Sequence, residues 1–468
     1  MRILLIKPST RRLYGNMYRS AILEPLGLEY IASVLLKKNY DVKILDLEAE
    51  QIDDKNLVRI LKKDPFDVIG FTMPTPLIRE VKHLINVIKS GLPDTTFIVG
   101  GPHPSSLPEH SLNYTGADIS IVGEGEETVV ELMQTLDSEK SLDKVRGICF
   151  KNNGEKTTTE PRPLIDDLDK IPFPARNLLR REQYWHVYTS KKKDEFYGSI
   201  MSTRGCPNQC IFCSSKRIFG SKFRMRSVGN VCDEIEEMIQ RFKIKWIYFL
   251  DDCFTLNMNR AADICREIIE RKLKFKWFAE TRVNTVNLEL LRLMRKAGCE
   301  MITYGIESGD PRVLKVIRKG ITVEQVKIAF KNSHKVGIRT RANFMIGHPT
   351  ETREEILQTI TLAKQIKPYD SGFYITLPIP GSKLYEMSLE QGVLEEDDYE
   401  NLMWYGEPKT TLANVSLREL KELQKRAYRE FYLRPSFIIN KLLNIRSVDE
   451  LVNLIKGARP LFSIIGSK

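Results

Sequence analysis

Three of the eight cysteines lie in one short segment, at Cys206, Cys210 and Cys213, with the spacing C-x3-C-x2-C. Gly205 and Pro207 favour a loop here, so the three thiolates can converge on one centre. A structural zinc ion needs four ligands, and no nearby Cys or His completes the set. Ferredoxin-type clusters also take four thiolates. Three thiolates with an open fourth position favour an iron–sulfur cluster that binds a small molecule at its free iron.

The composition indicates a globular protein. Of the 468 residues, 42% are hydrophobic and 28% are charged, which excludes a disordered or collagen-like chain. No apolar stretch approaches the roughly 18 residues of a membrane span, and the start of the chain lacks a signal-peptide pattern. We therefore expect a cytoplasmic protein. The cysteines outside the cluster segment are expected to be small buried hydrophobes. These cysteines are Cys149, Cys232, Cys253, Cys265 and Cys299.

Residues 1–137 alternate short apolar runs with helical patterns, which predicts an open parallel sheet of the Rossmann-like kind, with helices on both faces. The predicted strands are 2–6, 42–45, 68–71, 97–99 and 119–122. Ligands bind such sheets beyond the carboxyl ends of the strands, where this sequence has loops rich in Gly, Pro, Ser and Thr. No G-x-G-x-x-G follows the first strand, which argues against a nicotinamide-binding domain.

Residues 196–385 repeat the strand–helix alternation and predict six βα units, a partial version of the eight-unit barrel. The predicted strands are 198–203, 246–250, 277–280, 301–306, 340–346 and 373–377. Residues 138–195 contain turns and several prolines and are interpreted as a linker, and residues 386–468 as a C-terminal helical region.

The segment 202–213, including the aromatic Phe212 before the last cysteine, resembles the signature of the radical S-adenosylmethionine (SAM) superfamily. The resemblance implies that Cys206, Cys210 and Cys213 hold a [4Fe–4S] cluster. The fourth iron of this cluster would chelate the amino and carboxylate groups of SAM.

Further motifs follow the predicted barrel strands at their carboxyl ends, where an α/β barrel carries its active site. The stretches 304–309 and 344–349 resemble the SAM-contacting strand ends of this superfamily. The resemblance implies that a carboxylate such as Glu307 meets ribose hydroxyls or an ammonium group, and that the Gly347 backbone admits the adenine. The expected SAM contacts are Phe212, Asp251, Arg282, Glu307, Ser308 and Gly347.

The first domain, with its Gly-Gly-Pro-His-Pro and Val-Gly-Glu-Gly-Glu loops, resembles the cobalamin-binding domain of cobalamin-dependent radical SAM enzymes. The expected cobalamin contacts are Ser9, Thr72, Thr75, Gly100, Gly101, His103, Gly123, Glu124 and Gly125. The D-x-H-x-x-G motif, whose His coordinates cobalt, is missing, because residues 8–15 contain no His. We therefore expect cobalamin to be held without a histidine below cobalt. His103 either contacts the amides or phosphate of the cofactor or is a partly exposed loop residue.

These resemblances cover about residues 1–385 and imply an enzyme that generates a 5′-deoxyadenosyl radical and methylates an unactivated carbon. A cobalamin-dependent oxidative cyclase or rearrangement enzyme acting on a porphyrin or lipid is the alternative within this family. An iron–sulfur protein that binds nucleic acid would use the same cysteines without SAM turnover. A methylthiotransferase acting on RNA needs further cluster cysteines in the N-terminal domain, and this chain has none before Cys149.

The net charge of +11 favours anionic partners or simply maintains solubility. From Leu417 onward the chain carries 11 Lys/Arg against 5 Asp/Glu, with aromatic residues at helical spacing. This stripe is expected either to pack on the barrel or to meet an amphiphilic substrate or membrane surface. The expected partners are a small-molecule or lipid substrate and an external electron donor of the flavodoxin or ferredoxin type, without a stable nucleic-acid partner.

Overall fold

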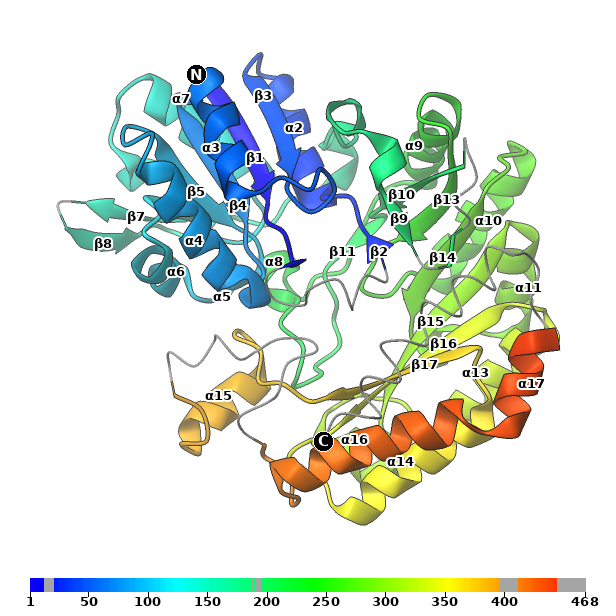
Figure 1. Cartoon of the computed structure of the whole chain (residues 1–468). Coiled ribbons are helices and arrows are strands. Elements are labelled where there is room, and N and C mark those ends of the chain that lie inside the picture. Colours follow the sequence, from blue (N-terminus) through cyan, green and yellow to red (C-terminus); the bar gives the residue numbers. More distant parts are fainter. Residues whose placement is uncertain (12–20, 153, 187, 190–194, 396–410, 444–468) are drawn as a thin grey trace.

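The computed structural model describes residues 1–11, 21–152, 154–186, 188–189, 195–395 and 411–443. Two large sheets lie side by side, and the C-terminal helices lie along the second sheet (Figure 1). The predicted order of an open α/β sheet, a partial barrel and C-terminal helices is confirmed.

The first sheet has the strand order β3-β1-β4-β5-β6-β7-β8, and the strands from β3 to β6 are parallel. Its parallel strands are β1 (Arg2–Lys7), β3 (Asp41–Asp46), β4 (Val68–Thr72), β5 (Thr96–Gly100) and β6 (Ile119–Ile121). Separate hydrophobic cores fill its two faces, which explains why the inner strands β1, β4 and β5 are apolar on both sides. The covering helices are α2 (Leu26–Leu36), α3 (Asp54–Lys63), α4 (Ile78–Lys89), α5 (Pro102–Ser106), α6 (Pro108–Thr115) and α7 (Glu126–Asp137).

This sheet continues beyond residue 137, into the range that we expected to be a linker. The antiparallel hairpin of β7 (Ile148–Asn152) and β8 (Glu155–Thr158) extends its edge beside β6. Only the first half of β7 is buried, and β8 is largely exposed. The sequence of β7 and β8 therefore lacks the apolar alternation that indicates a strand, although the turn before Gly154 can be recognised.

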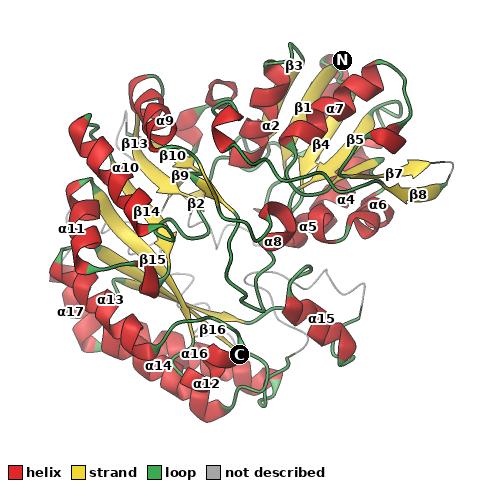
Figure 2. Cartoon of the chain, turned by 180° about the vertical axis from the view of Figure 1, so that it is seen from behind, coloured by secondary structure: helices red, strands yellow, loops and turns green. Residues whose placement is uncertain are grey.

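The second sheet is the predicted six-stranded partial barrel, with all neighbouring strands parallel and in chain order. Its strands are β10 (Phe196–Ile200), β13 (Ile244–Phe249), β14 (Lys276–Thr281), β15 (Cys299–Glu307), β16 (Arg339–Ile346) and β17 (Asp370–Ile375). Helices line its outer side, as Figure 2 shows. They are α9 (Val228–Gln240), α10 (Met258–Glu270), α11 (Leu288–Lys296), α12 (Pro311–Val316), α13 (Val323–Lys335) and α14 (Arg353–Ile366).

Short elements complete the chain between these units. The remaining strands form two antiparallel pairs, β2 (Ala21–Ile22) with β9 (Trp185–His186) and β11 (Thr203–Arg204) with β12 (Arg224–Met225). The remaining short helices are α8 (Lys216–Phe219), α15 (Lys383–Glu390), η1 (Thr75–Leu77), η2 (Leu142–Lys144), η3 (Leu168–Lys170), η4 (Arg176–Leu178), η5 (Arg181–Gln183) and η6 (Val283–Thr285).

The C-terminal helix α16 (Leu417–Tyr432) packs on the partial barrel beside β17, and α17 (Pro435–Leu443) follows it. The Tyr428 hydroxyl accepts a hydrogen bond from the backbone N–H of Phe373, and Phe431 is completely buried. The expectation that the aromatic stripe packs on the barrel is confirmed. Residues 396–410 and 444–468 of the expected C-terminal region lie outside the described residues. No helix in the described ranges is long and apolar enough to cross a membrane.

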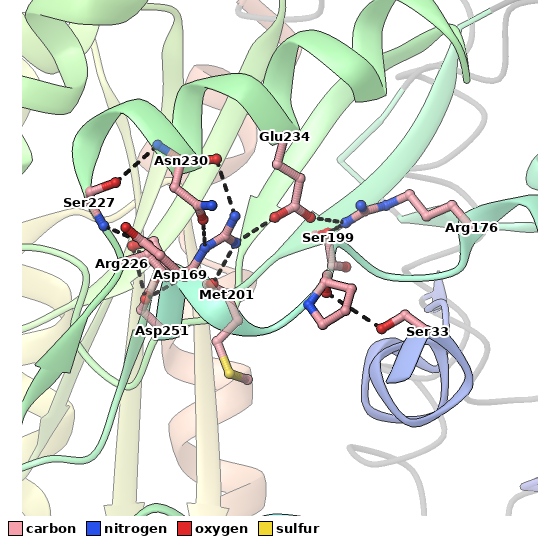
Figure 3. Close-up of polar contacts among 12 residues, drawn as sticks. Ser33, Asp169, Arg176, Ser199, Met201, Arg226, Ser227, Asn230, Glu234 and Asp251 are labelled. Carbon is pink, nitrogen blue, oxygen red and sulfur yellow. Dashed lines mark hydrogen bonds and ion pairs between the residues drawn. The ribbon is translucent and has the colours of Figure 1, made fainter. Parts of the chain in front are cut away.

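The segment between the two sheets is held by buried charges (Figure 3). Arg176 donates to the backbone carbonyl of Ser199 in β10 and forms an ion pair of 2.7 Å with Glu234 of α9. Arg226 pairs with the other oxygen of the same carboxylate, and all three charged side chains are buried. Toward the first domain, the backbone N–H of Ala175 donates to the carbonyl of Glu29 in α2. The segment therefore links α2 to the partial barrel.

Replacing Glu234 with Gln should strongly destabilise the protein. The substitution removes the carboxylate that pairs with both Arg176 and Arg226, and the loss of one partner from a buried pair costs about 3–5 kcal/mol. Chemical denaturation followed by circular dichroism measures the loss. Lys222→Gln, which removes an exposed ion pair with Asp166, is the control and should leave the transition unchanged. An unchanged transition for Glu234→Gln would contradict the assignment.

Candidate functional site

The three motif cysteines lie on a loop that backbone hydrogen bonds hold against the partial barrel. The N–H of Ile211 donates to the carbonyl of Ile317, and its carbonyl accepts from the N–H of Leu384. At the start of the loop, Gly205 has φ of +84°, and a Cβ there would lie 2.2 Å from the carbonyl oxygen of Lys222. Only glycine allows this approach, which orients the chain into Cys206.

Exposure separates these cysteines from the others. Cys206 and Cys210 are half-buried and Cys213 is exposed, whereas the five scattered cysteines are buried, as expected. Desolvation raises the pKa of the Cys213 thiol to about 11, and the charges of Asp252, Cys210 and Cys206 add to the rise. A cationic centre would favour the thiolate form of Cys213, and an iron–sulfur cluster held by the three cysteines supplies one.

A single metal ion fits less well. Within the described residues, no three Cys, His, Asp or Glu side chains converge as ligands of one ion. A [4Fe–4S] cluster does not require such convergence, because each thiolate binds a different iron. Polar side chains also reach the sulfurs: Asn208 Nδ2 lies 3.2 Å from Cys206 Sγ, and Arg282 Nη1 lies 3.8 Å from Cys210 Sγ.

Phe212 and Glu307 lie at the centre of the expected SAM site. Glu307 ends β15 at a register shift, in the left-handed region with φ of +70°, and forms a buried ion pair of 2.7 Å with Lys319 Nζ. Lys319 Nζ also lies 5.8 Å from the centre of the Phe212 ring. Gly305 makes room, because a Cβ there would lie 2.6 Å from Glu307 Oε1. The left-handed conformation of Glu307 is strained because this residue is not a glycine, and such strain is typical of functional sites.

His348 also lies near Phe212, in the stretch 344–349, but it is not among the expected SAM contacts. It is completely buried, its ring centre lies 6.1 Å from that of Phe212, and its Nδ1 lies 3.2 Å from Thr376 Oγ1. Burial lowers the pKa of His348 to about 3, so the ring is neutral. Its buried Nε2 has no hydrogen-bond partner in the described structure, which fits a ligand atom supplied by a bound cofactor.

Two of the expected SAM residues have internal contacts that organise the protein around the site, and their contact with SAM stays a prediction. Asp251 accepts hydrogen bonds from the N–H of Ser202 at 3.0 Å and from the Thr203 hydroxyl, and burial raises the pKa of Asp251. Asp251 thus fixes the strand that enters the cluster loop. The Ser308 hydroxyl lies 3.2 Å from Thr359 Oγ1 and is buried, so it joins β15 to α14.

The remaining two expected SAM residues also have internal contacts. Arg282 donates to the backbone carbonyl of Lys319, which joins the pair of Lys319 and Glu307 to the cluster loop. Gly347 has φ of +87°, and a Cβ there would lie 2.6 Å from Leu420 of α16. The glycine therefore permits α16 to pack closely, in addition to any room that its backbone leaves for adenine.

A cavity of about 250 Å³ lies along one face of the first sheet, where α2 and α7 line it, and it reaches the carboxyl ends of the strands. Six of the expected cobalamin contacts line it: Thr72, Gly100, Gly101, Gly123, Glu124 and Gly125. From the other side it is lined by Met201, Arg204, Ile218 and Phe219. A Cβ at Gly100 would have only Ile121 within 4 Å and would otherwise project into the cavity. A cofactor can therefore approach this backbone closely, so the cavity fits part of cobalamin.

Three expected cobalamin residues, Ser9, Thr75 and His103, do not line this cavity, and their contact with cobalamin stays a prediction. Ser9 donates its hydroxyl to Glu48 at 2.7 Å. Thr75 Oγ1 lies 3.1 Å from Nδ1 of His103, whose Nε2 lies 3.1 Å from Nδ1 of His110. His103 belongs to helix α5 and is completely buried, so it is not the partly exposed loop residue that we considered. Their polar groups are bonded to protein neighbours.

Glu124 binds two arginines of the partial-barrel domain, a contact that the sequence does not reveal. Its carboxylate lies 2.9 Å from Arg204 Nη1 and 2.8 Å from Arg224 Nη1. Arg204 also pairs with Glu126, and all four side chains are buried. These residues are separated by 78–100 positions in the chain, so local patterns carry no signal of their pairing.

Two family models match the chain in the positions of these two sites. The "Radical SAM superfamily" model matches residues 200–363, and the "B12 binding domain" model matches residues 18–133. The first contains the cluster loop, and the second contains most of the cavity wall on the first domain.

A protein of Pyrococcus horikoshii named as an uncharacterized methyltransferase is 35% identical over 94% of this chain and 95% of its own length. Among solved structures, the radical SAM methyltransferase TsrM of Kitasatospora setae, with cobalamin and a [4Fe–4S] cluster bound, has a TM-score of 0.69 at 20% identity, covering 84% of this chain and 75% of its own. The cobalamin-dependent SAM radical enzyme OxsB, with cobalamin and SAM bound, reaches 0.76 at 18% identity, covering 98% and 71%. The chain belongs to the cobalamin-dependent radical SAM enzymes, with a [4Fe–4S] cluster, SAM and cobalamin as cofactors.

Proposed function

We propose that this enzyme transfers a methyl group to an unactivated carbon of a small-molecule substrate. The cavity of the first sheet carries the proposal, because it reaches from the expected cobalamin-binding loops to Arg204 of β11, the strand that leads into the cluster loop. The methyltransferase similar to nearly the whole chain supports it. When bound, the cluster and SAM supply the radical that removes hydrogen, and cobalamin supplies the methyl group.

The protein residues position the reactants and limit access of water. Asp251 and Gly205 fix the chain on entry to the cysteine loop. The pair of Glu307 and Lys319 places a carboxylate and an ammonium group beside Phe212, where the polar groups of SAM can bind. At the amino ends of the barrel strands, a hydrophobic cluster that includes Trp246, Phe278 and residues of β2 and β9 closes the inner face of the partial barrel.

An external electron donor of the flavodoxin or ferredoxin type would reduce the cluster, and we place the enzyme in the cytoplasm. The half-exposed and exposed cysteines support access by such a donor. A further part of the proposal is that the basic C-terminal segment binds a lipid substrate or contacts a membrane surface. The excess of basic residues in a groove between α14 and α16 supports it, because four arginines and two glutamates line this groove: Arg353, Arg418, Arg426 and Arg429, with Glu419 and Glu422.

Anaerobic reconstitution should give about four irons per chain, as one [4Fe–4S] cluster requires. The triple variant Cys206→Ala, Cys210→Ala, Cys213→Ala should lose the iron and the visible absorption. Cys253→Ala is the matched control, because this buried thiol interacts electrostatically with Cys206 without belonging to the loop. Iron retention by the triple variant, or iron loss in the control, would overturn the ligand assignment.

Cobalamin should bind without a protein histidine below cobalt, because no histidine lines the cavity and both ring nitrogens of His103 have protein partners. Loading the enzyme with cobinamide, which lacks the nucleotide base, leaves protein as the only source of an axial imidazole. The Co(II) paramagnetic resonance spectrum should then show no nitrogen splitting. A nitrogen triplet that disappears in His103→Ala would contradict this expectation.

Methyl transfer itself can be tested with SAM that carries a trideuteromethyl group. Reaction with a metabolite extract and a chemical reductant should yield a product that has gained a trideuteromethyl group in place of hydrogen. S-adenosylhomocysteine and 5′-deoxyadenosine should form together, because one SAM supplies the methyl group and another the radical. Formation of 5′-deoxyadenosine with a cyclised product and no S-adenosylhomocysteine would instead support the oxidative cyclase.

A further inference from the structure

Arg204 lies at the point where the two cofactor sites meet. It ends the short strand β11, and only Gly205 separates it from Cys206. Arg204 lines the cavity of the first domain, and its guanidinium pairs with Glu124 in the loop after β6 and with Glu126, the first residue of α7. One side chain therefore joins the loop that holds the cluster to a loop that lines the cobalamin cavity.

The surroundings fix the position of this guanidinium. It lies over the ring of Tyr30 in α2, with 5.5 Å to the ring centre, and over the ring of Phe219 in α8, with 5.3 Å. Two aromatic faces and two carboxylates hold the planar group in this position when α2, α8 and the loop after β6 are all in place. Lysine cannot reproduce this arrangement, because its ammonium group is a point charge without the planar fork.

A second arginine holds the other side of the same loop. Arg224, opposite Arg204 in the antiparallel pair of β11 and β12, donates to Glu124 and, at 2.6 Å, to the carbonyl of Ile165. The N–H of Ile165 donates back to Glu124 at 2.8 Å. The two carboxylates and two guanidiniums therefore form a closed, buried and electrically balanced group.

We infer that Arg204 is a positioning residue that couples cobalamin binding to cluster binding. A ligand that orders the Gly123–Glu126 loop also orders the partners of Arg204, and through them the backbone two residues before Cys206. Cluster assembly acts in the reverse direction. By thermodynamic reciprocity, each cofactor then increases the affinity for the other by the same factor. The inference needs both cofactors but no particular substrate, so a failure of the methyl-transfer proposal leaves it intact.

The coupling is measurable with the full chain and hydroxocobalamin as the probe. Its dissociation constant is determined anaerobically by absorbance, once with the cluster reconstituted and once with the iron removed. In the wild type the cluster should tighten binding by about 5-fold or more, the lower end of ordinary coupling between sites. In Arg204→Lys this ratio should fall to near one. Hydrogen exchange at 205–213 should slow on cobalamin addition in the wild type only.

The control is Arg176→Lys, which makes the same exchange at another buried ion pair between the linker and the partial barrel. This variant should lose stability and keep the wild-type ratio. If Arg204→Lys does not fold, Glu126→Gln removes one charge and keeps the shape, and it should also lower the ratio. A wild-type ratio of one, or a full ratio in Arg204→Lys or in a folded Glu126→Gln variant, overturns the inference.

Discussion

Buried charge at the contact between the two domains is the constraint on which the rest of the structure depends. Carboxylates and guanidiniums out of water are costly unless each has a partner, and a single missing partner is heavily penalised. Arg176 with Glu234, and Arg204 with Glu124, satisfy this condition only when the first domain, the linker and the partial barrel adopt one arrangement. These ion pairs thus define the orientation of the first domain relative to the partial barrel more strictly than apolar packing alone would.

That orientation has a chemical consequence. Both sheets are largely parallel, so their loops for ligands lie at the carboxyl ends of the strands. The ion pairs of Glu124 bring the carboxyl-end loop after β6 against β11, which leads directly into the cysteine loop. A methyl donor held by one sheet and a radical source held by the other can then act on one substrate between them.

The sequence predicts most of this architecture because its signals are local. Apolar runs such as residues 68–71 and 301–306 gave strands that the structure extends by a few residues at most. The cluster loop followed from cysteine spacing alone. The hairpin of β7 and β8 was missed, because a half-exposed edge has no clear apolar period.

Long-range contacts explain the remaining differences. The partners of Glu124 and Glu307 lie on other elements, and no local pattern shows that a carboxylate after a strand will bind an arginine 80 residues away. Likewise, His103 follows a strand end in sequence but turns into helix α5.

The magnetic interaction between cob(II)alamin and the reduced cluster in the fully loaded enzyme tests the central claim most directly. We predict that paramagnetic resonance shows mutually split or broadened signals, as expected for centres held close together. A spectrum that is the simple sum of two isolated centres would contradict the account.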